Sequence, residues 1–369
     1  MTWIARRHPA RRQLAWRLRS SDSAAFPVRK PRARRNRTHR IGSMAAPGRE
    51  RAGRWLAPLL DRWEAAMPEP IRTRTVTWGL AAVFLIVTLE RTLRAVQLGT
   101  LWIDLRIYRA AADAAIHGAD PWQAGVDGLT FAGAPPALVP YVPSALLPEN
   151  VAIAVYLAVS VVAAVAVLRA LGLPLWWLIF PPLAETLVVL NSDVFVIALL
   201  VAGGRWAFAS VVVKVYAVIP LVLKRRWISA AAGAVICLVA LPLVPQFLAD
   251  RDSTTAALEA QSFGGLSAWG SWLLIPTAGA LIALFGRGAE WLTVPAVWPF
   301  TQLHYNVLAL PVAAASPMVA FLLSFAVWPL PAIAAILYAI EVVARQIAAP
   351  YRKPTGVARS RLPPFKPDA

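Results

Sequence analysis

Three ionisable side chains lie in or beside apolar stretches of this sequence, where a charge is costly and is often kept for a function. Asp104 follows Trp102 at the start of an amphipathic stretch, and Lys214 interrupts a run of valines. His304 lies in the segment Trp298–Asn306, far along the chain. A carboxylate at a membrane boundary can serve as a general base, and a lysine there can bind an anionic phosphate.

Each of these residues also has a structural interpretation. Asp104 would complement the dipole at the start of a helix. His304 could be a hydrogen-bonded structural residue, and the Lys214 side chain could extend to a membrane surface. Glu185 and Asp193 are two further acids in apolar surroundings that could cap a helix or pair with a base. The residue types alone leave both interpretations open.

The elements that must position these residues are predicted to be membrane helices. The chain has 369 residues, of which 58% are hydrophobic and only 15% are charged. The apolar residues come in blocks, and inside a bilayer every backbone group must be hydrogen-bonded within its own segment. We therefore expect an all-α, polytopic transmembrane helical bundle.

The net charge of +18 is confined to the two ends of the chain. Residues 1–75 hold 19 Lys and Arg against 5 Asp and Glu, and residues 345–369 hold 6 against 1. Such tails stay cytoplasmic, so we expect both termini inside a multi-pass cell-membrane protein. The tails lack a folded recognition motif, and we expect no nucleic-acid partner. The predicted parts are a basic, largely disordered tail over 1–75, a transmembrane domain over 76–346, and a basic tail over 347–369.

Apolar runs of roughly twenty residues locate the membrane segments. The first runs from Val76 to about Val96, and Lys224-Arg-Arg226 is the strongest internal cytoplasmic signal. We expect roughly eight to eleven membrane pieces in all. Those before the polar external loop at 249–270 are 150–168, 174–190, a half-membrane piece at 191–204, 206–223 and 227–248, and those after it are 271–285, 290–300 and runs across 305–346.

The first loop, residues 97–149, is predicted to be extracytoplasmic and to carry surface helices. It has more acidic than basic residues, which suits the outer face. Ile103–His117 has helical character and is followed by Gly118 and an Asp-Pro turn at 120–121. We expect this helix to lie along the membrane surface.

Several kinds of chemistry are not indicated. Cys237 is the only cysteine, so no disulfide can form within the chain. The carboxylates show no metal-ligand spacing, and the sequence has no phosphate-binding glycine loop or Ser-His-Asp motif. We therefore expect no metal and no cofactor. The first residues lack the apolar core of a signal peptide, and Met44 offers an alternative start.

Six segments, in order along the chain, resemble the polyprenol-phosphate-mannose-dependent alpha-mannosyltransferases of actinobacteria, the DUF2029 family of membrane GT-C type. They are Asp104–Tyr108, Gly118–Trp122, Phe131–Pro136, Lys214–Pro220, Ala260–Ser262 and Trp298–Tyr305. The resemblance covers about 76–346 and implies a GT-C-like bundle. It places the family's proposed catalytic base on Asp104, its late active-site histidine on His304, and its lysine on Lys214.

The resemblance implies transfer of a hexose, most simply mannose, from a polyprenyl phosphate to a lipid-linked or cell-wall glycan on the extracytoplasmic face. Partners would be the polyprenyl-phosphate-linked sugar, the glycolipid or glycan acceptor, and the lipid bilayer. Arg106 and Arg109 are near enough to Asp104 in sequence to offer charge-assisted bonds to the phosphate. We expect Tyr108 and Gln261, which lie in the matching segments, to contact substrate as well.

Two other functions remain open. A multi-pass transporter or lipid flippase would bind its substrate at broken helices, although the long first loop and the lack of visible repeats favour the transferase. A catalytically degenerate relative is suggested by two departures from the family pattern. The family's Gly-Gln signature is here Leu190-Asn191-Ser192-Asp193, and Gln302 stands where a tryptophan is usual.

Overall fold

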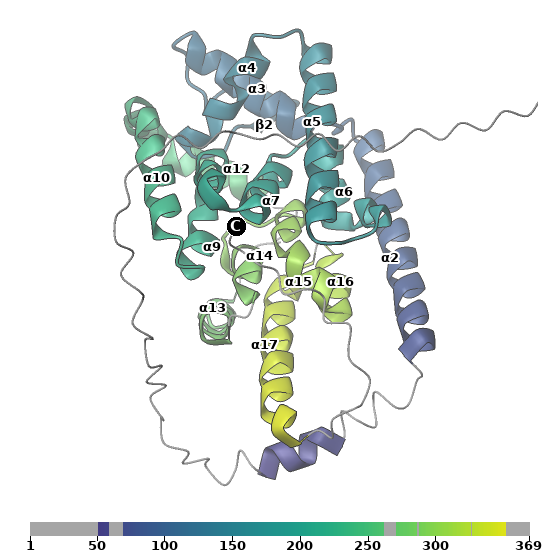
Figure 1. The fold of residues 1–369 in the computed structure, drawn as a ribbon. Helices are drawn as coiled ribbons and strands as arrows, with labels where there is room; N and C mark the ends of the chain where they lie inside the picture. The colour runs from purple at the N-terminus through teal and green to yellow at the C-terminus, as the bar shows by residue number, and fades with distance from the viewer. Residues whose placement is uncertain (1–50, 59–68, 262–270, 286–287, 326, 352–369) are drawn as a thin grey trace, which may run out of the picture. The chain divides into compact units, whose positions relative to one another are not determined.

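The computed structural model describes residues 51–58, 69–261, 271–285, 288–325 and 327–351 (Figure 1). These residues are mostly helical, and their only sheet pairs β1 (Gly125–Val126) with β2 (Leu129–Thr130) in antiparallel fashion. The expected helical class is confirmed for them. The predicted tails, including Met44, fall largely outside the described residues, although 51–58 is helical.

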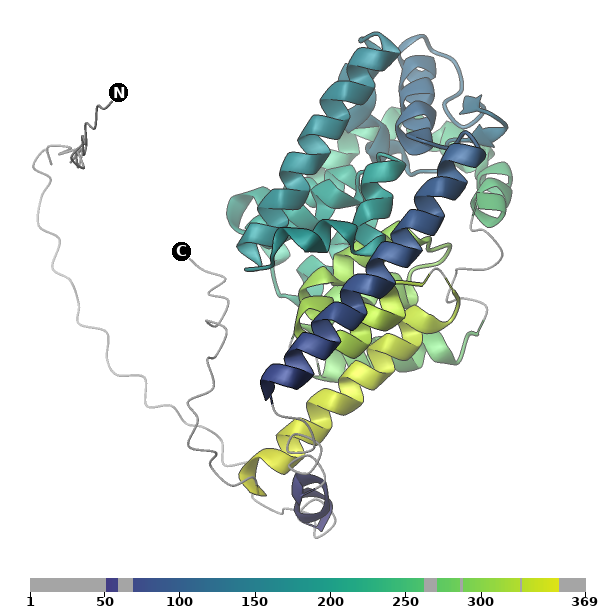
Figure 2. The ribbon, with the colours of Figure 1, turned by 90° about the vertical axis from the view of Figure 1, so that its right-hand side faces the viewer.

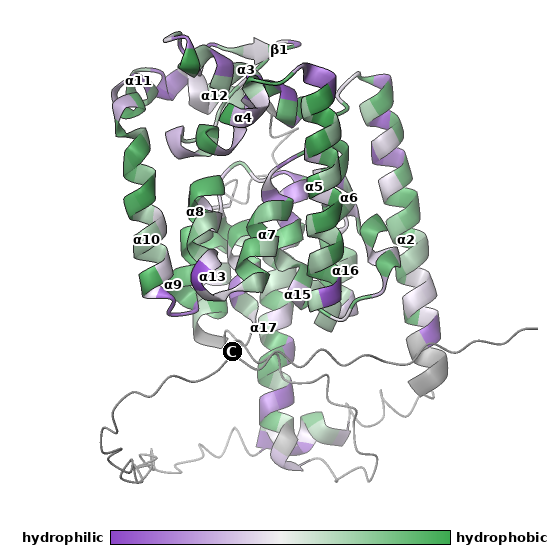
Figure 3. Ribbon diagram, turned by 45° about the horizontal axis from the view of Figure 1, so that its top comes forward, coloured by the Kyte–Doolittle hydropathy of each residue, from purple (hydrophilic) through white to green (hydrophobic). Residues whose placement is uncertain are grey.

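Within the described residues, four helical segments are long and apolar enough to cross a membrane. They are α2 (Glu69–Gln97), α5 (Glu149–Ala170), the run of α10 (Trp227–Cys237), η5 (Leu238–Leu243) and α11 (Val244–Ala249), and α17 (Leu330–Ala348). Figure 3 shows hydrophobic residues along much of α2, α5 and α10. Large apolar side chains such as Ile86, Val162 and Val239 point outward on these helices and are 66–73% exposed. Such surfaces suit a lipid solvent and indicate membrane association.

The segment 174–190, predicted as one span, is instead two short pieces, and that prediction is wrong. A 3-10 helix, η2 (Leu175–Ile179), is separated at Phe180 from α6 (Pro181–Val188). Pro181 and Pro182 lack the backbone N–H that a continuing helix would need, but they fit the first turn of a new one. The segment is apolar, as the prediction assumed, but the two prolines prevent it from forming one continuous helix.

The next stretch is also divided into short pieces, with breaks at Gly203 and Lys214. It comprises α7 (Asp193–Ala202), η3 (Gly204–Phe208), α8 (Ala209–Val213), η4 (Val215–Ala217) and α9 (Val218–Leu223). The polar loop expected at 249–270 instead contains a helix, α12 (Arg251–Gln261). The remaining elements are α13 (Leu274–Phe285), η7 (Ala289–Leu292), α14 (Thr293–Val297), η8 (Leu303–Ala309), α15 (Leu310–Ala315), α16 (Pro317–Leu323) and η9 (Ala349–Tyr351).

The first loop folds into a small layer of its own. It contains α3 (Ile103–Ile116), close to the predicted range, then β1, β2, η1 (Pro135–Tyr141) and α4 (Val142–Ala145). The apolar face of α3 packs with Trp122, Phe131 and Leu138 in a cluster separate from the main core. Figures 1 and 2 show this layer beside the end of α2 and the start of α5.

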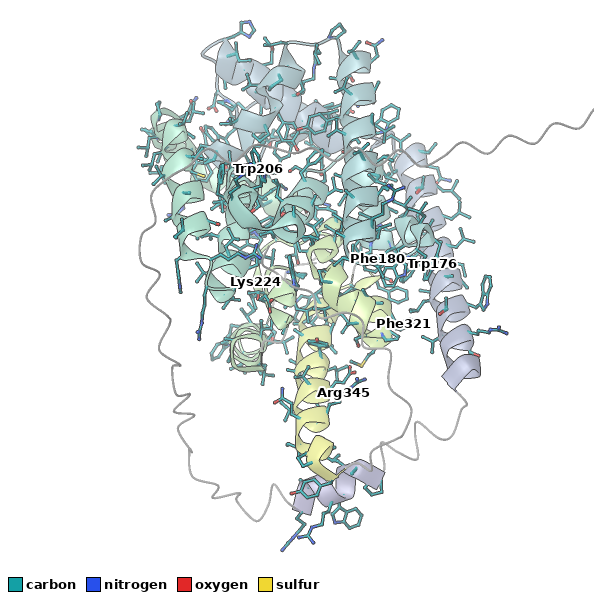
Figure 4. The ribbon with its side chains drawn as sticks, in the orientation of Figure 1. Trp176, Phe180, Trp206, Lys224, Phe321 and Arg345 are labelled. Carbon is teal, nitrogen blue, oxygen red and sulfur yellow. The ribbon has the colours of Figure 1, made fainter. Side chains whose placement is uncertain are left out.

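Aromatic and polar contacts attach α2 to η2 and α6. The buried ring of Phe84 lies 5.0 Å from that of Phe180 and 5.7 Å from that of Trp176, measured between centroids. Figure 4 labels Phe180 and Trp176. Arg91 donates two hydrogen bonds, of 2.9 and 3.1 Å, to the carboxylate of Glu185. Glu185 is therefore the partner of a base, one of the two structural roles expected for it.

Candidate active site

A cavity of about 300 Å³ lies where the first loop meets the broken helices. Its polar lining includes Asp104 from α3, Asn191 from the segment before α7, Lys214 from the segment after α8, and His304 from η8. Its aromatic lining includes Tyr108, Tyr216, Phe247, Trp298, Phe300 and Tyr305. The structure thus brings together Asp104, Tyr108, Lys214 and His304, four of the residues predicted from the sequence to act at the site.

Asp104 is positioned by backbone contacts between α3 and the end of α6. The N–H groups of Trp102 and Asp104 donate to the carbonyl oxygens of Val188 and Val189, at 2.9 and 3.1 Å. Trp102 has φ 60°, and Leu190 on the other segment has φ 55°. Left-handed backbone costs a non-glycine residue about 1–2 kcal/mol, so the packing around it must hold these turns in place. The two turns bring α3 and the residues before α7 to one point.

Asn191 connects the carboxylate to the imidazole. Its side-chain nitrogen Nδ2 lies 2.5 Å from Oδ2 of Asp104 and 3.2 Å from Nε2 of His304. Its oxygen Oδ1 accepts the backbone N–H of Asp193 at 2.9 Å. This last contact closes an Asx turn, the usual local use of an asparagine just before a helix. Asp104 and His304, 200 positions apart in sequence, therefore share one partner.

His304 is held in a mostly buried position by short elements. It is the second residue of η8, which packs against α6, and its side chain is 5% exposed. Its ring stacks on that of Tyr305, with the centroids 4.8 Å apart. The imidazole can therefore turn little, and its Nε2 atom faces the polar groups of the cavity.

Asp193 lies behind the cavity and is fully buried. Its Oδ1 atom is 3.5 Å from Nζ of Lys214 and accepts a hydrogen bond from the hydroxyl of Tyr216. Its Oδ2 atom is 3.6 Å from Nε2 of His304 and has no hydrogen-bond donor among the described residues. A buried carboxylate needs a compensating charge, and Lys214 supplies it.

Lys214 interrupts the helical path between α8 and η4 with an extended backbone, at φ −148° and ψ 120°. This break directs the Lys214 side chain toward a group of tyrosines. The Nζ atom lies 5.6, 5.9 and 5.3 Å from the ring centroids of Tyr108, Tyr216 and Tyr305. Aromatic faces attract a cation, so these rings and Asp193 stabilise an ammonium at the cavity wall.

The tyrosines of the first loop are uncharged. Burial raises the pKa of Tyr108, because the phenolate would lose its hydration, and the charge of Lys214 opposes that rise only in part. Burial likewise raises the pKa of Tyr141, whose ring packs 4.4 Å from that of Tyr108. Tyr108 can therefore act as a hydrogen-bond donor and as an aromatic surface at the cavity.

Two residues expected to bind substrate, Arg106 and Arg109, do not line this cavity. Arg106 pairs with Asp127 at 3.0 Å and with Glu149 at 3.1 Å. Arg109 donates to the carbonyl oxygens of Ser144 and Leu147 at 3.0 and 2.7 Å. Both arginines therefore connect parts of the first loop to one another.

Gln261, which was also expected to bind substrate, ends α12. Its side chain lies outside the described residues, while Leu258 of the same helix lines the cavity.

Sequence reasoning did not place Asn191 or Tyr216 in the site and left Asp193 without a role there. The local signal was the polar group Asn191-Ser192-Asp193 between two apolar runs, and Tyr216 lies in the segment Lys214–Pro220 that carries the resemblance. In the described part of the chain, no three His, Cys, Asp or Glu side chains gather as a metal site would require.

Comparisons with known proteins add no identification. No protein-family model matches the chain, and no curated protein or solved structure shows significant similarity to it.

Proposed function

We propose that this protein is a membrane glycosyltransferase that moves a hexose from a polyprenyl phosphate to a hydroxyl group of a lipid-linked or cell-wall glycan. The observation that carries the proposal is the meeting of Asp104 and His304 at one cavity, joined by Asn191. The cavity lies beside α3 and η1 of the first loop, where a lipid-linked sugar at a membrane surface would arrive.

The proposed reaction is a single displacement at the anomeric carbon. Asp104 takes the proton of the acceptor hydroxyl, whose oxygen bonds to the anomeric carbon. The bond from that carbon to the phosphate oxygen breaks, and its electron pair leaves with the polyprenyl phosphate. A phosphate leaves without strong acid assistance, so one base on the acceptor side is sufficient. This displacement inverts the anomeric configuration.

Lys214 is the group best placed to bind the donor phosphate. It is a cation at the cavity wall, whereas Arg106 and Arg109 are engaged within the first loop. A fixed positive charge near the leaving oxygen would stabilise the charge that develops there. The polyprenyl chain would lie along outward apolar helix surfaces. Because the predicted orientation places the first loop outside the cell, the reaction would take place on the extracytoplasmic face.

The test is transfer from radiolabelled polyprenyl-phosphate-mannose in membranes that contain the protein. Asp104→Asn keeps the shape of the side chain but removes the base, and we expect a rate loss of about 10²–10⁴-fold with normal membrane expression. Asp113→Asn, on the exposed face of the same helix, is the matched control. Equal transfer by the Asp104→Asn variant and the unaltered protein would exclude the proposed role.

One observation also suits the transporter alternative. The helical path breaks at Lys214 beside a cavity, and transporters bind substrates at such breaks. A transporter would move a labelled lipid-linked sugar across a vesicle membrane without changing its covalent linkage. The covalent product of the transfer assay therefore separates the two functions.

A further inference from the structure

We propose that Asn191 is the positioning residue of this site, because its side-chain amide orients the Asp104 carboxylate and keeps His304 in the tautomer with its proton on Nδ1. The inference deepens the proposed function and rests on it for the role of Asp104 as a base. The contacts of Asn191 themselves can be tested without any assay of sugar transfer.

The orientation of the Asn191 amide follows from its three partners. Oδ1 accepts the N–H of Asp193 at 2.9 Å, so the oxygen must face the backbone of α7. A rotated amide would set a donor against that N–H group and an acceptor against the Asp104 carboxylate. The NH₂ group therefore faces the cavity, and its two hydrogens can serve two acceptors.

Those two acceptors are Oδ2 of Asp104 and Nε2 of His304. A neutral imidazole accepts through the nitrogen that lacks a proton, so acceptance at Nε2 requires the proton to be on Nδ1. One oxygen of Asp104 is held by the amide, and Oδ1 is the oxygen left to take a proton from the acceptor sugar. Asn191 thus sets the directions of both groups.

Asp193 gives His304 a second possible hydrogen-bond partner, so two tautomers of the imidazole compete. Its buried Oδ2 atom has no hydrogen-bond donor among the described residues and lies 3.6 Å from Nε2 of His304. If the Asn191 amide were removed, a proton on Nε2 would gain Asp193 as a partner. Loss of Asn191 should therefore shift His304 toward the other tautomer.

The chain offers a direct spectroscopic test, because it has only four histidines. With ¹⁵N-labelled histidine in lipid-reconstituted full-length protein, His304→Gln assigns the His304 signals. We expect the Nδ1–H tautomer in the unaltered protein and a shift toward Nε2–H in Asn191→Leu. Asn306→Leu is the control, since Asn306 is also buried but donates to the carbonyl oxygen of Leu323. An unchanged His304 spectrum in Asn191→Leu would overturn the proposal.

The kinetic test separates positioning from folding. Asn191→Leu should lower kcat by about 10²-fold with little change in KM for the donor, as expected when reacting groups are misaligned. Asn191→Asp keeps the shape and the Asx turn but places a second carboxylate beside Asp104. Because two adjacent carboxylates tend to retain a proton, the acidic limb of the kcat profile should move to higher pH by about one unit or more.

A purely structural role for Asn191 predicts lower stability without this pH shift, and that result would overturn the proposal. Failure of the proposed function gives a different pattern. The unaltered protein would then transfer no sugar, while the His304 tautomer would still depend on Asn191.

Discussion

The long helices and the broken segments of this protein present opposite kinds of surface. On α2 and α5, large apolar side chains such as Leu85, Ile86 and Val162 point outward. The broken segments around α6, α7, α8 and η8 bury polar groups instead, among them Asn191, Asp193 and His304. A continuous helix satisfies its own backbone and can face lipid, whereas a break exposes backbone and side-chain polar groups toward a shared interior.

The difference indicates a division of roles. The long helices present surfaces suited to a membrane, and the interruptions bring together the polar groups that line or adjoin the cavity. Prolines and extended residues such as Pro181 and Lys214 cause those interruptions. A substitution on an outward helix face should therefore change the free energy of unfolding little. A substitution at a break should lower the stability, the rate of the proposed reaction, or both.

The largest effect on stability is expected from Asp193→Asn. This change leaves the Lys214 ammonium buried without its anion, which typically costs about 3–5 kcal/mol. The free energy of unfolding of the detergent-solubilised protein, monitored by tryptophan fluorescence, measures this loss of stability. The double variant Asp193→Asn with Lys214→Met removes both charges and should recover part of the loss. A single variant as stable as the unaltered protein would show that the ion pair contributes nothing.

A smaller effect, confined to one helix, should distinguish the two faces of α2. Phe84 is fully buried against the rings of η2, while Ile86 is 66% exposed. Phe84→Ala should lower the free energy of unfolding by about 3 kcal/mol, whereas Ile86→Ala should change it by less than about 0.5 kcal/mol. The same unfolding experiment measures both. Equal losses for the two variants would contradict the assignment of inner and outer faces.

The smallest effect is expected from Arg106→Gln. Its ion pairs with Asp127 and Glu149 involve partners that are half or more exposed, and such pairs contribute about 0.2–1 kcal/mol each. If Lys214 rather than Arg106 binds the donor phosphate, KM for the donor should change less than about threefold. A much larger rise in KM would return Arg106 to the role that the sequence suggested.

Residues with a distinctive local pattern could be predicted. Asp104 and Lys214 are charges within apolar stretches, and the range of α3 followed from helical character ended by glycine. The spans of α2 and α5 followed from apolar runs of sufficient length. Each of these features depends on neighbouring residues, so the sequence contains the necessary information.

The role of Asn191 could not be predicted in the same way. Locally, Asn191-Ser192-Asp193 indicates only the start of a helix, and its contacts with α3 and η8 depend on the packing of α6. The partners of Arg106 and Arg109 come from later parts of the first loop, at distances that no local pattern encodes. Proximity to Asp104 in sequence was therefore a poor guide to proximity in the cavity.

In a bilayer, the lengths of the continuous helices would make the protein sensitive to the thickness of the hydrocarbon core. At about 1.5 Å per residue, the 22 residues of α5 extend about 33 Å and the 19 of α17 about 28 Å. A typical hydrocarbon core of about 30 Å lies between these values, so α5 would tilt slightly and α17 would need little tilt. Because α5 begins directly after the first loop, lipids with shorter or longer acyl chains would change its inclination and pull on the layer that carries Asp104.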